Sequence, residues 1–234
     1  MRRSVFGFCI LSAILALSGC QSGGLYISTK AGGETLLYVG FKVEMIYIPQ
    51  ADVPKLALLM AYVDEQESIG SRGAIFKAND VWGGAVRARM AEAASGVESK
   101  FSVLKRRTIP YVIQLGKPAS IAVGEKPLGD FVFYFQRPEA AQVNADARNR
   151  FELRVVFTAE SDEQCTLLVE PTMAGPPGSN IEPRVLSELT MKARMAKGQS
   201  VYIAPIQFRP NSIGSFFSAN LRGIPAILLL KITL

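Results

Sequence analysis

Few side chains in this sequence of 234 residues carry the chemistry of covalent catalysis. There are three cysteines, Cys9, Cys20 and Cys165, and there is no histidine. The lack of histidine excludes nucleophilic machinery of the Ser-His-Asp and Cys-His kinds, together with zinc sites that contain histidine. The cysteine thiols remain, and their reactivity depends on how much thiolate each one carries.

Cys20 follows a stretch with the parts of a secretion signal. Arg2 and Arg3 give a positive start, and residues 5–17 are apolar but shorter than the ~20 residues of a permanent membrane span. The sequence LSGC at residues 17–20 resembles the lipobox of bacterial lipoproteins. This resemblance implies a diacylglycerol on the Cys20 thiol, cleavage just before Cys20 and acylation of the new amine. Several acyl chains anchor a protein stably to a membrane.

The expected domain organisation follows from this signal. Residues 1–19 are expected to be a lipoprotein signal peptide, residues 20–35 a tether, and residues 36–234 a single β-rich domain. Gln21 follows Cys20 in place of an aspartate. By resemblance to enterobacterial sorting rules, this favours an outer-membrane lipoprotein of the cell envelope that faces the periplasm or is embedded in the membrane. An ordinary signal peptide with an incidental Cys20 is the alternative.

Composition limits the partners of the mature chain. Without residues 1–19 and their two arginines, 215 residues remain and the formal charge falls from +6 to +4. The densest basic cluster, residues 105–107 with nearby Lys100, is too short for a nucleic-acid-binding stripe, so we expect a solvated face and no nucleic-acid partner. Cys165 is left without an intramolecular disulfide partner, and we expect it to be a small strand residue, with a reactive thiol as the alternative.

Catalysis by carboxylates remains open without histidine. Glu125 and Asp130 flank a loop with proline and glycine, and they are the candidates for a hydrolase such as a wall-active one. The alternative is that both are turn residues of a hairpin. The sequence has no Walker loop, no Gly-x-Gly-x-x-Gly and no calcium loop. We therefore expect a protein that is not an enzyme and that holds no cofactor or metal.

Hydrophobic periodicity predicts a mainly β fold of the α+β class, an antiparallel sheet domain with two helices in its first half. Thr35–Ile48 alternates as a half-buried strand does. One helix is expected to begin with Asp52 as its cap and Pro54 in its first turn, and to stop near residues 67–70. The other helix is expected at 85–95. Further strands are expected at 101–104, 111–115, 120–123, 131–136, 151–159, 166–170, 186–195, 200–206 and 226–234, with turns at Ile109-Pro110 and at residues 197–199.

The order of these elements resembles the C-terminal domain of bacterial secretins. Secretins are the ring-forming outer-membrane channel subunits of type II and type III secretion and of type IV pilus systems. The stretches that carry the likeness are 39–48 with its Val43-Glu44, 101–125 with its ending ASIAVGE, 151–171, 184–203 with its GQSV, and 224–234. The chain departs from the family at residues 204–206, where API replaces the usual Gly-Gly-Leu.

The resemblance implies a subunit that acts in protein secretion or pilus-type transport by forming homo-oligomers. Its partners would be the membrane, through the lipid on Cys20, and the secretion or pilus machinery. Only ~15 residues separate Cys20 from the first expected strand, which is too few for the periplasmic N-terminal domains of secretins. This departure motivates the alternative of an accessory or binding lipoprotein of an envelope complex that forms no pore.

Overall fold

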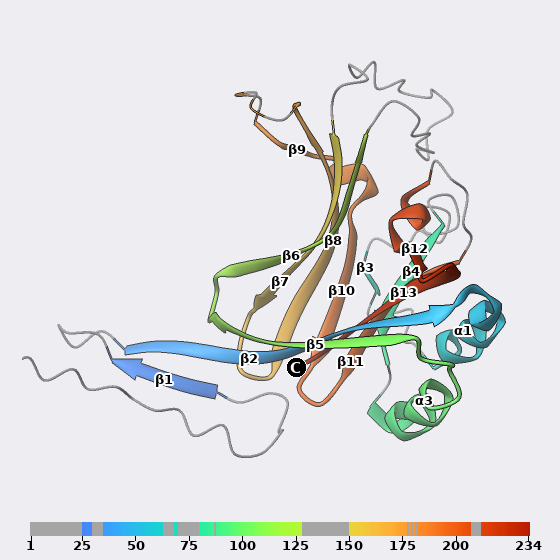
Figure 1. Cartoon of the computed structure of the whole chain (residues 1–234). Helices are drawn as coiled ribbons and strands as arrows, with labels where there is room; N and C mark the ends of the chain where they lie inside the picture. The colour runs from blue at the N-terminus through green and yellow to red at the C-terminus, as the bar shows by residue number, and fades with distance from the viewer. Residues whose placement is uncertain are drawn as a thin grey trace, which may run out of the picture.

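Two antiparallel sheets and two helices make up the described part of the molecule (Figure 1). The computed structural model describes residues 25–29, 35–62, 68–69, 80–86, 88–127, 150–176, 178, 180, 182–206 and 212–234. The expected mainly β fold of the α+β class, with both helices in the first half of the chain, is confirmed.

The first sheet has seven strands in the order β1-β2-β13-β11-β4, with β5 beside β2 and β12 beside β13. These strands are β1 (Leu25–Thr29), β2 (Thr35–Pro49), β4 (Val81–Ala85), β5 (Lys105–Gln114), β11 (Ser200–Pro205), β12 (Ser218–Leu221) and β13 (Ile224–Thr233). The first and last long strands lie side by side, because β2 pairs with β13 from Lys42 opposite Thr233 to Pro49 opposite Ala226.

The second sheet has six strands in the order β3-β10-β8-β7-β6, with β9 beside β8. These strands are β3 (Ser68–Ile69), β6 (Pro118–Pro127), β7 (Arg150–Ala159), β8 (Gln164–Ala174), β9 (Arg184–Val185) and β10 (Met191–Ala196). The helices are α1 (Val53–Met60) and α3 (Ala91–Glu98), and the 3-10 turns are η1 (Gln50–Asp52), η2 (Ala88–Met90), η3 (Ser187–Leu189) and η4 (Ile213–Phe217).

The larger hydrophobic core lies between the two sheets, whose strands cross steeply in Figure 1. Alternate residues of β7 are buried, which is the period-two pattern of a strand with one face on a core. The Phe157 ring of β7 lies 5.1 Å from the Phe41 ring of β2 and 5.5 Å from the Tyr111 ring of β5. These aromatic contacts join the sheets and add to the burial of apolar surface.

A second core lies on the other face of the first sheet, where α1 and α3 pack. Leu56 and Leu59 of α1 and Val97 of α3 are buried against Ile46 and Ile48 of β2. Strand β2 is therefore buried on both faces along its second half, whereas the alternation predicted a half-buried strand. The helices form the layer that the alternating pattern of the strand itself did not reveal.

The first helix is shorter than the sequence predicts, and the second helix begins later along the chain. The first helix ends at Met60, where Tyr62 N–H bonds to the Leu59 carbonyl in a tightened last turn, and not near residues 67–70. The second helix covers Ala91–Glu98, whereas 85–95 was expected. Ala85 instead ends β4, because residues 81–85 complete a ladder with β11.

Several strand boundaries also differ from the prediction. Residues 101–104 are not a strand, and the expected turn at Ile109-Pro110 lies inside β5. The strand expected at 186–195 is divided into β9, η3 and β10. The expected tether of residues 20–35 contains β1, which pairs with β2. The strand expected at 131–136 lies outside the described residues. None of the described helices is long and apolar enough to span a membrane.

Candidate functional site

The residues predicted to do chemistry do not form a cluster in the described part of the chain. Cys20 and Asp130 lie outside the described residues. Glu125 lies on β6, where its Oε1 accepts a hydrogen bond of 2.8 Å from Arg150 Nη1. The Glu125 carboxylate is therefore held by a cation on the neighbouring strand β7. Among the described residues, no group of three or more cysteines and carboxylates is placed to hold a metal ion.

Cys165 faces the core between the sheets from strand β8. Its side chain is buried, and burial raises the pKa of the Cys165 thiol to about 12. The thiol is therefore protonated at neutral pH, which makes it a poor nucleophile there. The predicted role as a small strand residue is confirmed by its packing among the core side chains of both sheets.

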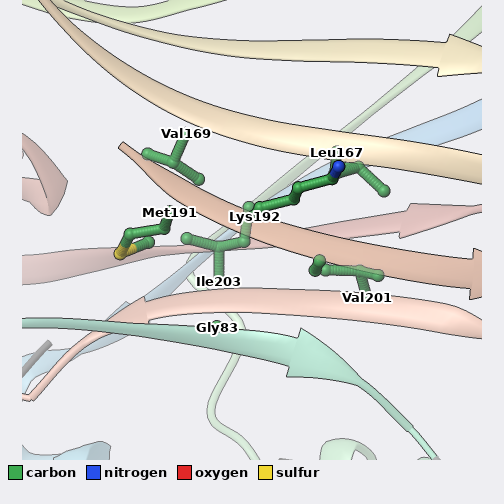
Figure 2. A pocket seen from close by; sticks show the side chains of 8 residues that line it. Gly83, Leu167, Val169, Met191, Lys192, Val201 and Ile203 are labelled. Atoms are coloured by element: carbon green, nitrogen blue, oxygen red, sulfur yellow. The ribbon is translucent and has the colours of Figure 1, made fainter. Parts of the chain in front are cut away.

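A small, partly open cavity lies between the two sheets (Figure 2). It measures about 10 Å³, which is at the lower limit for one water molecule. Apart from Lys192, its lining is apolar and includes Gly83 of β4, Leu167 of β8 and Ile203 of β11. The cavity has neither the volume nor the polar groups of a ligand site.

Lys126 of β6 and Ser215 of η4 form a polar pair that the sequence did not reveal. Lys126 Nζ donates to Ser215 Oγ at 2.9 Å and to the Ser215 carbonyl at 2.8 Å. Burial lowers the pKa of Lys126. A lysine beside a serine is also the arrangement of a base and a nucleophile, but Ser215 is only 4% exposed. The pair therefore fastens η4 to the second sheet rather than presenting a nucleophile to a substrate.

An ion network lies where α3 meets the first sheet. Glu98 of α3 bonds through Oε2 to Lys231 Nζ at 2.7 Å and through Oε1 to Arg106 Nη2 at 3.0 Å. Arg106 Nη1 also contacts Glu44 Oε1 at 3.1 Å. Both carboxylates are buried and each is paired, so the network satisfies its own charges and holds the helix on the sheet.

A groove of about 340 Å³ lies on the outer face of the second sheet, away from the core. Its volume falls at the lower end of the range for ligand sites. It spans β6, β7 and β8 and reaches the segment that leads into β9. The residues that line it are Pro118, Ala119, Ser120, Arg154, Val156, Glu170, Thr172, Pro183 and Val185.

The charges of the groove are unevenly paired. Arg154 Nη2 lies 2.8 Å from Glu152 Oε2 on the same strand, and this hydrogen bond raises the pKa of Arg154. Glu170 lies opposite Arg154 in the β7–β8 ladder. Burial raises the pKa of Glu170, and the charge of Arg154 only partly offsets this effect. The described residues give the Glu170 carboxylate no hydrogen bond.

The sequence did not point to this groove, because its walls come from four separated parts of the chain. The alternation of β7 does place Glu152, Arg154 and Val156 on the face away from the core, which is the one local signal. Which residues of β8 and β9 lie beside them follows from the strand register alone.

Comparison of the chain with protein-family models, with curated proteins and with solved structures finds no match.

Proposed function

We propose that the protein is a lipid-anchored subunit of the bacterial envelope that resembles the C-terminal domain of secretins and acts by assembling with copies of itself. The lipid anchor on Cys20 would hold it at the outer membrane. Support comes from the placement of the secretin-like stretches, which form β2, β5 and β6, β7 and β8, β9 to β11, and β13. They contribute strands to both sheets of the described body.

The observation that carries this proposal is the pair of long strands at one side of the molecule. Strand β5 is an edge strand of the first sheet and β6 is an edge strand of the second. Only the turn at residues 115–117 separates the two strands along the chain. Among the described strands, β5 pairs only with β2 and β6 pairs only with β7. Each sheet thus presents an edge of ten residues with unused backbone groups.

The backbone groups on the free edge of β5 follow from its register. Leu115 N–H donates to the Leu37 carbonyl at 2.8 Å, and the two residues continue the β2–β5 register. Alternate pairs are hydrogen-bonded in an antiparallel ladder, so odd residues of β5 bond to β2 and even residues face the free edge. Pro110 is therefore tolerated, because its missing N–H falls on the free edge. Val112 presents a free N–H there.

Head-to-tail pairing of such edges generates a ring when the rotation between subunits closes. Strands β4 and β3 end the two sheets at the opposite side and would receive β5 and β6 of the next copy. The proline in β5 and the bulge in β6 between Ala122 and Gly124 limit unspecific pairing and favour a matching partner.

The test is cryo-electron microscopy of the full-length, lipidated protein extracted in mild detergent. Closed rings are expected, and monomers at every concentration would contradict assembly. Val112→Pro removes the edge N–H without removing a ladder hydrogen bond, so this variant should fold but not form rings. Val112→Ala is the matched control, since it shortens the same 59% exposed side chain and keeps the N–H. Circular dichroism verifies the fold of both variants.

A second candidate function is an accessory or binding lipoprotein of an envelope complex that forms no pore. The observation that favours it is the polar outer face of the second sheet, where Glu152, Arg154 and Glu170 lie at the centre of β7 and β8. Charged side chains in that position suit water rather than lipid. This candidate predicts monodisperse monomers in the same micrographs, and a Cys20→Ser variant that stays in solution without detergent.

A further inference from the structure

We propose that the groove on the outer face of the second sheet binds an alkylammonium or guanidinium group on an apolar stem, as the side chain of a lysine or arginine provides. This binding site goes beyond the assembly function and does not depend on it. The argument rests on the charge of the groove, on its walls and on one buried hydroxyl.

The charge of the groove favours a cation. Arg154 is the cation of the lining, and two carboxylates, Glu152 and Glu170, lie beside it. Because Arg154 already bonds to Glu152 at 2.8 Å, Glu170 remains as an excess negative charge. The raised pKa of Glu170 reflects the burial of this carboxylate without a hydrogen bond from the described residues. A bound cation would supply the missing charge-assisted hydrogen bond.

The same pairing disfavours an anionic ligand. A carboxylate or phosphate would need the guanidinium of Arg154, which Glu152 already occupies. The ligand would also lie beside the negative charge of Glu170, which would repel it. The groove therefore discriminates by charge between cations and anions.

The walls of the groove fit an apolar stem. Val156 and Val185 line it from β7 and β9, and Pro118 and Pro183 add apolar surface to the lining. Val185 is 42% exposed in the free protein, so a methylene chain laid against it would be removed from water. A volume of about 340 Å³ holds one long side chain and part of the backbone that carries it.

Thr172 is an independent sign of a ligand in this groove. It lines the groove and is only 3% exposed. The described residues provide no hydrogen-bond partner for its hydroxyl. Buried hydroxyls without a partner are rare in folded proteins, because each costs free energy of desolvation. A ligand N–H or carbonyl close to Thr172 would satisfy this group.

Isothermal titration calorimetry of the full chain with two blocked peptides tests the proposal. Acetyl-Ala-Lys-Ala-amide carries its only cation on the lysine, and acetyl-Ala-norleucine-Ala-amide carries a similar stem without charge. The lysine peptide is expected to bind and the norleucine peptide is not. Equal binding of both peptides, or binding of neither, would overturn the proposal. Free butylamine distinguishes a small amine from a lysine side chain as the ligand. If butylamine also binds, the groove recognises the amine alone. If only the lysine peptide binds, the groove recognises a lysine within a peptide.

Three variants locate the site. Glu170→Gln keeps the shape of the groove and should weaken binding of the lysine peptide by about tenfold or more, as expected for the loss of one charge-assisted hydrogen bond. Glu163→Gln makes the same change on the exposed turn between β7 and β8 and should leave binding unchanged. Thr172→Val removes the hydroxyl at nearly constant shape and should weaken binding without lowering the melting temperature. Unchanged affinity in Glu170→Gln, with its fold intact, would refute this location.

Discussion

Tyr202 Oη donates a hydrogen bond of 2.7 Å to Glu98 Oε2 and thereby ties strand β11, which lies between β13 and β4, to the helix that covers it. Lys231 Nζ donates to the same oxygen at 2.7 Å, and Arg106 reaches the other oxygen at 3.0 Å. One buried carboxylate on α3 thus connects β5, β11 and β13. Removing its charge should act on the attachment of the helix layer as a whole.

Glu98→Gln is expected to flatten the acid dependence of stability. Burial alone would raise the pKa of Glu98, but hydrogen bonds from Lys231 and Tyr202 outweigh it and hold the pKa below its ordinary 4.5. The contribution of Glu98 to the free energy of unfolding is therefore complete above about pH 4.5 and is lost as pH falls through the lower pKa of the folded state. Urea unfolding between neutral pH and about pH 3 measures this dependence. At neutral pH, the free energy of unfolding of Glu98→Gln is expected to be about 1–3 kcal/mol lower than that of the unsubstituted protein.

The matched control for this prediction is Glu92→Gln, on the exposed face of the same helix. It should leave both the stability and its dependence on pH nearly unchanged. An equal pH dependence in Glu98→Gln and in the unsubstituted protein would show that Glu98 titrates normally when folded.

The same substitution of glycine by alanine is expected to have opposite effects at two positions. A Cβ at Gly83 would lie 3.1 Å from the Tyr202 carbonyl oxygen and 3.1 Å from Ile203 Cγ1, so Gly83→Ala should destabilise the protein by about 1–3 kcal/mol. A Cβ at Gly96 meets nothing within 4 Å, so Gly96→Ala should stabilise α3 by about 0.5–1 kcal/mol. Thermal unfolding of both variants, compared at one temperature, measures the signs; a stabilising Gly83→Ala would mean that the β4–β11 contact relaxes easily.

Local patterns predicted what depends on neighbours in sequence. The alternation of β2 and the glycine turn at residues 197–199 are examples, since period two and a left-handed Gly198 are properties of a few consecutive residues. The sequence predicts a turn at Ile109-Pro110, whereas β5 runs through both residues. A proline is compatible with a strand only when its nitrogen faces a free edge. Which strands lie at an edge depends on partners that are distant in sequence. The groove was missed for the same reason, since Arg154 and Glu170 meet through the β7–β8 register.

Cys165 is expected to resist alkylation in the folded protein. With a pKa of about 12, only about one part in ten thousand of the thiol is ionised at pH 8, and the side chain is buried. Iodoacetamide at pH 8, followed by peptide mass spectrometry, should find Cys165 unmodified in the native protein and fully modified in denaturant. Rapid native modification of Cys165 would mean that strand β8 opens locally on the timescale of the reaction.

Lipid attachment at Cys20 is tested most directly by metabolic labelling with palmitate in a bacterial host. The unsubstituted chain should take up label, and Cys20→Ser should lose it, because the thiol is the only group that can form the thioether to diacylglycerol. Cys9→Ser is the matched control, since it removes a thiol from the apolar stretch and should keep the label. A mature chain that is cut yet carries no label would instead indicate an ordinary signal peptide. In that case the described two-sheet body would have no lipid anchor at Cys20, and any assembly through its strand edges would proceed without one.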